Sequence, residues 1–186
     1  LSGANVQCSG TWSTSASTSG SWVGSRAAHP SSQGRIVYTR WPDNADPDIC
    51  SLDVANGRWS LLQSNVLPDS AIGSTPRGDR IVYASGDRPA EVCSAGSGGW
   101  SRLTTTPNWH EGHPSVSPSG DRIAVSRISW PISGLKQLVT LRMDGSLDRI
   151  LLESEDTPGP PTWSPDGTRL CFEMDSRLYV INADGS

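Results

Sequence analysis

One phrase of six residues recurs four times in this chain, and its spacing limits the folds that the chain can adopt. Each copy is a small polar turn, an arginine and a short apolar run. The copies lie at 33–38 (QGRIVY), 78–83 (GDRIVY), 120–125 (GDRIAV) and 167–172 (GTRLCF). Their arginines are separated by 45, 42 and 47 residues. A strand-rich unit that returns about every 40–47 residues is typical of the blades of a β-propeller.

Two further phrases follow the same period. Residues 138–145 (LVTLRMDG) align with residues 178–185 (LYVINADG). Asp-Gly after an apolar strand indicates a tight hairpin, because glycine accepts a positive φ without steric cost. The phrase Gly-x-Trp-Ser occurs at 10–13, 57–60 and 98–101. We interpret it as the start of the outermost strand of a blade.

These repeats divide the chain into units of four strands, ordered from the innermost to the outermost. The units cover about 21–63, 64–105, 106–153 and 154–186. The last unit stops after its third strand, whereas residues 5–18 carry an outer-strand phrase with no blade before it. We therefore predict an all-β propeller of four four-stranded blades, with the last blade closed by the N-terminal strand, since closure removes exposed sheet edges. There are two alternatives: another chain completes the ring, or this chain is an excerpt of a longer propeller.

Composition agrees with many short strands joined by many turns. The 186 residues include 19 glycines and 14 prolines, and hydrophobic residues make up 34%. The net charge of −4 argues against a nucleic-acid-binding face. No apolar run reaches the roughly 18 residues that a membrane-spanning helix needs.

Residues 161–170 (PTWSPDGTRL) and the strand at 178–185 resemble the repeat signature of the TolB-like propellers, also known as PD40 or WD40-like repeats. Unit three repeats the signature at 114–122 (PSVSPSGDR), with Val116 in place of the tryptophan. In the turn Ser-Pro-Asp-Gly, proline presets φ, aspartate can bond the turn backbone, and glycine takes the left-handed position.

This resemblance implies several settings for the chain. Such propellers bind other proteins in the bacterial envelope, stand beside hydrolase domains, or form part of lyases. A periplasmic or extracellular location follows from the resemblance. Complete members usually have about six to eight blades, so a dimer that completes an eight-bladed ring, or a fragment, stays open.

The candidate binding residues gather before the inner strand of unit three and at related positions of earlier units. They are Trp109, His110, Glu111, His113, Asp69 and Trp41. The first four should line one mouth of the central channel. Asp69 aligns with Glu111 by counting back from the repeat glycines, and Trp41 lies in a loop after a second strand. We predict that they bind a protein or peptide; a carbohydrate is a second possibility, because exposed loop tryptophans suit sugars.

Catalysis and metal binding find less support. Two histidines and a glutamate at 110–113 (HEGH) suit a divalent metal. They do not form the helical His-Glu-x-x-His motif, and a solvated loop is the plain alternative. The chain has no Gly-x-Ser-x-Gly elbow. We therefore predict a non-catalytic binding scaffold with no catalytic residue, metal or cofactor. The propeller portion of a larger hydrolase or metal-dependent lyase, and a self-assembling structural unit, are the alternatives.

The cysteines and the recurring tryptophans occupy repeat positions. Cys50, Cys93 and Cys171 stand where sister units carry hydrophobic residues, so we predict free thiols in the core. Cys8 has no clear repeat position. Trp12, Trp59 and Trp100, which recur with the repeat, are predicted to pack, and Trp163 of the repeat signature is predicted to be buried.

Overall fold

A computed structural model of the chain describes residues 5–13, 19–27, 34–40, 48–63, 72–76, 78–86, 89–96, 99–131 and 134–186. All of the regular secondary structure in these ranges is β-strand. Within them, no helix has the length and apolar character needed to cross a membrane.

The chain forms two compact units. The first comprises residues 1–36 and 52–59, and the second comprises residues 37–51 and 60–186. The first unit contains the antiparallel hairpin of β1 (Asn5–Ser13) and β2 (Ser19–Ala27). Pairing with β2 occupies one edge of β1, and residues 14–18 lie outside the described residues. Closure of the last blade by residues 5–18 therefore stays a prediction.

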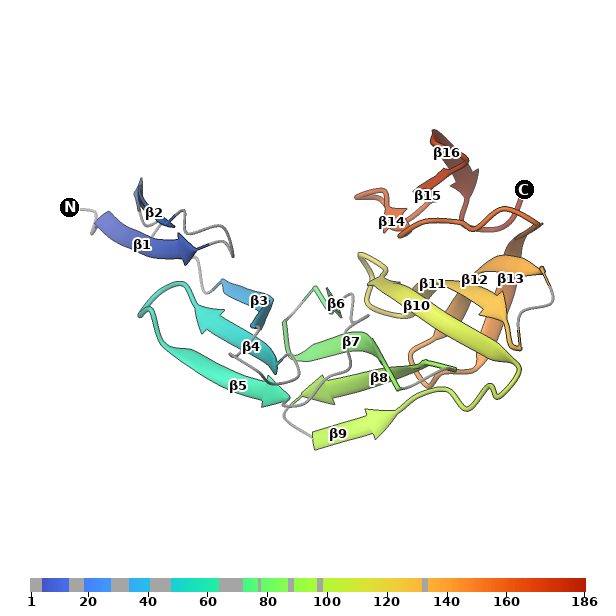
Figure 1. Ribbon diagram of the computed structural model, residues 1–186, viewed down its shortest axis with the longest axis horizontal. Helices are drawn as coiled ribbons and strands as arrows, with labels where there is room; N and C mark the ends of the chain where they lie inside the picture. The colour runs from blue at the N-terminus through green and yellow to red at the C-terminus, as the bar shows by residue number, and fades with distance from the viewer. Residues whose placement is uncertain are drawn as a thin grey trace. The chain divides into compact units, whose positions relative to one another are not determined.

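The remaining strands form four sheets in which each strand is bonded to the next along the chain (Figure 1). The first sheet consists of β3 (Arg35–Arg40), β4 (Asp48–Asp53) and β5 (Trp59–Gln63). The second sheet consists of β6 (Ile72–Ser74), β7 (Arg80–Ser85), β8 (Glu91–Gly96) and β9 (Gly99–Arg102). The third sheet consists of β10 (Trp109–Val116), β11 (Arg122–Ser129), β12 (Lys136–Arg142) and β13 (Leu147–Ser154). The fourth sheet consists of β14 (Thr162–Trp163), β15 (Arg169–Met174) and β16 (Arg177–Asn182).

The repeat phrases mark these strands as predicted. A repeat arginine begins a strand in each sheet: β3, β7, β11 and β15. The phrase Gly-x-Trp-Ser begins the outer strands β5 and β9, whereas its copy at 10–13 lies at the end of β1 and not at the start of a strand. The all-β meander sheets are therefore confirmed, whereas the boundaries and number of the blades stay predictions.

The sheets stack face to face, because alternate residues of a strand face opposite neighbours. In β7, Ile81 and Tyr83 pack in a cluster with Ile49 of the preceding sheet, whereas Val82 packs in a cluster with Ile123 of the next sheet. A further cluster joins the third sheet to the fourth through Ala124, Leu138, Leu151, Trp163, Leu170, Phe172 and Ala183. Burial of each large side chain stabilises this stacking by about 1.5–3 kcal/mol.

Two of the tryptophan predictions have opposite outcomes. Trp163 is buried, and its indole Nε1 donates a 2.9 Å hydrogen bond to the carbonyl of Ser115 in the preceding sheet. Trp59 and Trp100 are 56% and 53% exposed, so the prediction that they pack is wrong. They lie on the outermost strand of their sheets, where packing covers a smaller part of the ring.

The cysteines are free thiols at Cys50, Cys93 and Cys171, as predicted. Cys50 and Cys93 are buried, whereas Cys171 is half-buried. Burial raises the pKa of the Cys93 thiol to about 11, which keeps it protonated and unreactive at neutral pH. The side chain of Cys8 lies outside the described residues.

Candidate binding site

The strand β10 carries most of the predicted binding residues, and it lies at a junction of sheets. It contacts β6, β7 and β8 of the preceding sheet and β14 of the following sheet. The first strands β6, β10 and β14 are thus neighbours within the second unit (Figure 1). Side chains of β10 therefore face neighbouring sheets on both sides.

A β-bulge interrupts β10 between Gly112 and Ser115, where its pairing with β11 shifts register. His113 lies inside this bulge with a φ of 53°. A residue with a Cβ pays roughly 1–2 kcal/mol for the left-handed conformation. Bulges change the direction in which a side chain points and are common beside functional sites. The bulge therefore places the His113 ring at a cost in backbone strain.

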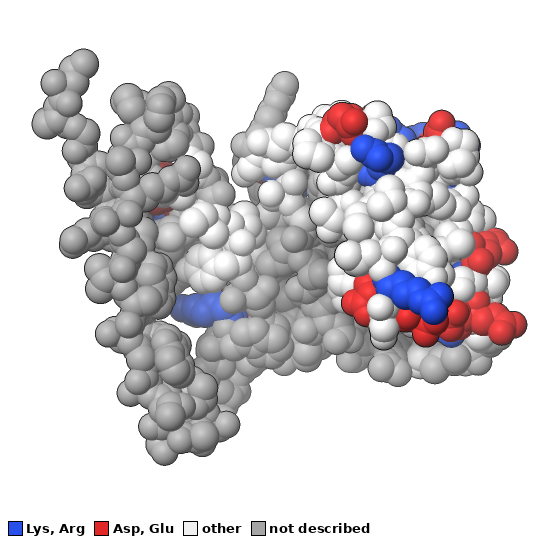
Figure 2. All heavy atoms as spheres, turned by 90° about the horizontal axis from the view of Figure 1, so that it is seen from above, with Lys and Arg blue, Asp and Glu red and all other residues white. Residues whose placement is uncertain are grey.

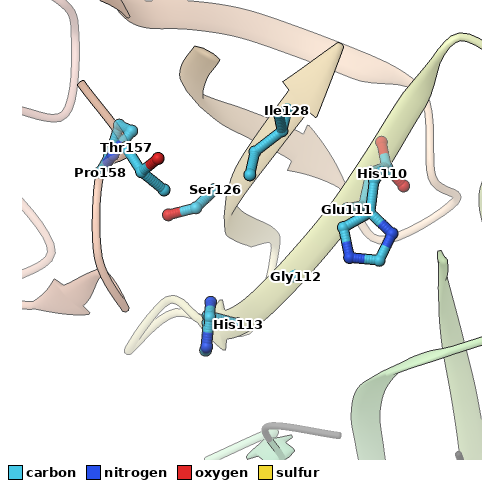
Figure 3. A pocket seen from close by; sticks show the side chains of 8 residues that line it. All are labelled: His110, Glu111, Gly112, His113, Ser126, Ile128, Thr157 and Pro158. Atoms are coloured by element: carbon cyan, nitrogen blue, oxygen red, sulfur yellow. The ribbon is translucent and has the colours of Figure 1, made fainter. Parts of the chain in front are cut away.

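A pocket of about 250 Å³ opens between β10, β11 and the segment before β14 (Figure 3). Its lining residues are His110, Glu111, Gly112, His113, Ser126, Ile128, Thr157 and Pro158. The two histidine rings project from β10, and Thr157 and Pro158 form the opposite side. The structure thus brings together three predicted residues, His110, Glu111 and His113, in one pocket.

The wall formed by Thr157 and Pro158 is tied to two sheets. The Ser126 hydroxyl of β11 donates a 2.8 Å hydrogen bond to the carbonyl of Gly159. The amide of Gly159 donates a 2.7 Å hydrogen bond to the carbonyl of Glu173 in β15. A Cβ on Gly159 would lie 3.1 Å from this carbonyl oxygen, so glycine permits the close approach. The pocket therefore has a fixed width.

His110 joins the pocket to the preceding sheet. The amide of Ala90 donates a 2.9 Å hydrogen bond to His110 Nδ1. Because Nδ1 accepts, the neutral ring carries its proton on Nε2. The ring also lies 6.5 Å from the Trp130 ring, centroid to centroid. The orientation and the tautomer of this imidazole are thereby fixed.

Glu111 is fully buried behind the pocket surface. Its Oε2 lies 2.5 Å from the Thr104 hydroxyl, and its Oε1 has no hydrogen-bond partner. The nearest cation is Arg127, with Nη1 3.9 Å from Oε1. Burial is the largest effect on this carboxyl and raises the pKa of Glu111 above its ordinary value.

Arg127 is buried as well and belongs to a chain of polar side chains. Its Nε and Nη2 donate hydrogen bonds of 2.9 and 2.7 Å to Gln137 Oε1. Gln137 Nε2 donates a 2.7 Å hydrogen bond to Glu153 Oε1. Burial lowers the pKa of Arg127, and the carboxylates of Glu111 and Glu153 oppose this shift.

Of the other predicted residues, Trp109 is described by the structure and does not line the pocket. The Trp109 ring is half-buried and lies against the guanidinium of Arg127. Trp41 and Asp69 lie outside the described residues. Binding by all six predicted residues stays a prediction.

Five lining residues were not predicted as binding residues from the sequence: Gly112, Ser126, Ile128, Thr157 and Pro158. Ser126 and Ile128 belong to β11, whose sequence pattern predicts a buried strand and gives no sign of a binding site. Pro158 falls at the repeat position of Glu111, so the repeat alignment held a signal for the second wall.

In the ranges that the structure describes, no group of three His, Cys, Asp or Glu side chains is placed to hold a metal ion. On the face shown in Figure 2, basic and acidic side chains lie beside one another. Among the described residues, an ion pair joins Arg142 Nη2 to Asp148 Oδ1 at 3.0 Å.

Comparison with protein-family models gave no match, and comparison with curated proteins gave none either. Solved structures do match. A TolB from Agrobacterium tumefaciens is 24% identical with a TM-score of 0.68, over 82% of this chain and 58% of that chain. TolB from Acinetobacter baumannii is 20% identical with a TM-score of 0.64, over 81% of this chain and 38% of that chain. An oligogalacturonate lyase in complex with manganese is 12% identical with a TM-score of 0.67, over 99% of this chain and 59% of that chain.

These similarities, together with the stacked meander sheets, define the fold as a β-propeller. Within this class, the chain has the TolB-like propeller fold that its repeat signature predicts. The chain spans 58% and 38% of the two TolB chains. The fold is shared with binding proteins and with enzymes, so function has to be argued from the site.

Proposed function

We propose that this chain is a non-catalytic binding scaffold that holds a segment of a protein or peptide at the pocket on β10. The observation that carries the proposal is the meeting of His110, Glu111 and His113 with the wall of Thr157 and Pro158. These residues come from β10 and from the segment between β13 and β14, which joins the third sheet to the fourth. A site of this kind is rigid because the stacked sheets position both of its walls.

The size of the pocket supports a side-chain anchor. Its volume of about 250 Å³ lies below the range of roughly 300–1,000 Å³ that is usual for small-molecule pockets. Ile128 and Pro158 offer apolar contact, and the imidazoles of His110 and His113 offer hydrogen bonds. One inserted side chain with a polar end fits this combination, and pockets filled in this way dominate binding energy at protein interfaces.

The setting proposed for this interaction is the bacterial envelope, periplasmic or extracellular. The similarity of the fold to two TolB structures and to a periplasmic gluconolactonase supports this location. A partner that is a second copy of the chain, completing a ring, belongs to the same proposal.

Peptide selection tests the site without knowledge of the partner. Random peptides are selected on the purified chain and then measured against Thr157→Trp, which fills the pocket. Thr105→Trp is the matched control, since Thr105 is also exposed and does not line the pocket. We expect selected peptides to lose at least about tenfold in affinity for Thr157→Trp, equivalent to about 1.4 kcal/mol, and to keep their affinity for Thr105→Trp. Peptides that bind both variants equally, or no selected peptide at all, would contradict the proposal.

A metal-dependent lyase is the second candidate. Its support is the oligogalacturonate lyase in complex with manganese, whose similarity covers 99% of this chain. Metal analysis of the purified chain separates the two candidates. Stoichiometric manganese that His110→Ala or His113→Ala abolishes would favour the lyase, whereas binding of selected peptides in chelator-treated protein would favour the scaffold.

A further inference from the structure

The hydroxyl of Thr104 stands between two carboxyl groups. Its Oγ1 lies 2.8 Å from Glu91 Oε2 and 2.5 Å from Glu111 Oε2. It also accepts a 2.9 Å hydrogen bond from the amide of Val92. A threonine hydroxyl has one proton and two lone pairs. It can therefore donate to only one of the carboxyl groups, and the other must itself bring a proton.

The surroundings decide which carboxyl carries that proton. Glu91 accepts from the amide of Thr106 at 2.9 and 3.1 Å and from the Thr106 hydroxyl at 3.2 Å. The Glu91 carboxyl group is therefore the acceptor in each of these contacts. Glu111 is fully buried, and its Oε1 has no hydrogen-bond partner. Because an unpaired buried charge is far more costly than an unpaired carbonyl oxygen, the proton belongs on Glu111.

We propose that Glu111 is a neutral carboxylic acid in the folded protein and donates its proton to Thr104, which in turn donates to Glu91. Two hydrogen bonds through the Thr104 hydroxyl then join β10 of the third sheet to β8 and to the segment after β9 in the second sheet. Each donated proton in this arrangement has an acceptor. Glu111 Oε2 donates, Thr104 Oγ1 accepts from Glu111 and from Val92, and Glu91 accepts from Thr104. This site lies directly behind the pocket, but the inference does not depend on any partner.

The charged and titratable groups that interact with Glu111 are Glu91 and Cys93 on β8 and Arg127 on β11. Glu153 on β13 acts on Arg127, to which Gln137 links it. The Glu91 carboxylate opposes ionisation of Glu111, whereas Arg127 favours it. Arg127 is 3.9 Å away and directs its other nitrogens at Gln137, so burial prevails and raises the pKa of Glu111.

This arrangement makes the contact between the two sheets sensitive to a rise in pH. The ordinary pKa of the side chain is 4.5, and folding raises it. The stabilisation from the neutral form is therefore complete below that value and is lost as pH rises through the pKa in the folded state. Loss of the proton leaves two carboxylates that compete for one hydroxyl proton. The wall of the pocket behind His110 then also gains a negative charge.

Glu111→Gln tests the proposal, because the amide copies a neutral acid in shape and in donating to Thr104. We expect a midpoint of thermal unfolding equal to or above that of the original chain, and a flatter decline of that midpoint above about pH 4.5. We also expect the loss of a carboxylic-acid C=O band from the infrared spectrum. Glu173→Gln is the matched control, since Glu173 is exposed, and should leave both the pH profile and the band unchanged.

Two outcomes would overturn the proposal. If Glu111→Gln lowers the midpoint as much as Glu111→Ala does, the native side chain is ionised. If the original chain shows no infrared band of a protonated carboxyl at pH values above the ordinary 4.5, Glu111 has no proton to donate. The second measurement uses the unchanged protein and so does not depend on whether a variant folds.

Discussion

The guanidinium carbon of Arg127 lies 4.4 Å from the centroid of the Trp109 ring. Arg127 is buried and bonded to Gln137 on its other side. The indole therefore covers a cation that the rest of the site holds away from water. Trp109 therefore has a structural role in addition to the binding role that the sequence predicts for it.

Replacement of Trp109 should show whether its side chain contributes more to stability or to peptide binding. We expect Trp109→Leu to lower the free energy of unfolding by about 1–2 kcal/mol, because it removes a cation–π contact with a partly desolvated arginine. Trp109→Phe keeps a ring face and should lose less. Denaturant titration of both variants measures this difference. Weaker peptide binding with unchanged stability in Trp109→Leu would instead assign the ring to the binding site.

His113 should show opposite effects on stability and on binding. Its φ of 53° suits glycine, so we expect His113→Gly to stabilise the fold by up to about 1 kcal/mol. The same change removes an imidazole from the pocket and should weaken the binding of selected peptides. Thermal unfolding and peptide titration measure the two effects.

Ser176→Gly is the control for this prediction. Ser176 has a φ of 57° in the turn between β15 and β16 and does not line the pocket. It should stabilise the fold without an effect on peptide binding. Equal binding by His113→Gly and the original chain would remove His113 from the site.

The sequence predicted the strands better than the site, for a physical reason. Arg35, Arg80, Arg122 and Arg169 mark strand starts because turn chemistry and apolar alternation are local properties. The local pattern failed at Trp59 and Trp100, since recurrence in a repeat says nothing of how far packing extends toward the rim of a sheet.

The sequence did not predict which side chains of neighbouring sheets contact one another. His110 and His113 were predicted, but the wall opposite them comes from Thr157, more than 40 positions further along the chain. The sharing of Thr104 by Glu91 and Glu111 also joins two sheets. The repeat period shows that neighbouring sheets stack, but it does not show which polar side chains meet when they do.

Gly145 should be more sensitive to substitution than other turn glycines. It has a φ of 87°, and a Cβ there would overlap the backbone of Leu103, which directly follows β9. Gly78 has a φ of 66° with nothing close to its Cβ position. Gly78→Ala should therefore cost only the left-handed strain of roughly 1–2 kcal/mol, and Gly145→Ala should cost clearly more. Equal losses in denaturant titration would show that the backbone of Leu103 moves aside freely.

The Ser-Pro-Asp-Gly turn should keep its aspartate ionised in acid. The Asp166 carboxylate accepts hydrogen bonds from the hydroxyl of Ser164 and from the amide and hydroxyl of Thr168. These bonds lower the pKa of Asp166 from 3.8 to about 2, with the Ser164 bond the largest contribution. A lowered pKa stabilises the fold above the ordinary value, and this stabilisation is lost as pH falls from 3.8 toward about 2. NMR titration of the Asp166 carboxyl carbon measures the shift. Ser164→Ala should raise the pKa toward 3.8, and an unchanged pKa in that variant would mean that the hydroxyl does not hold the turn.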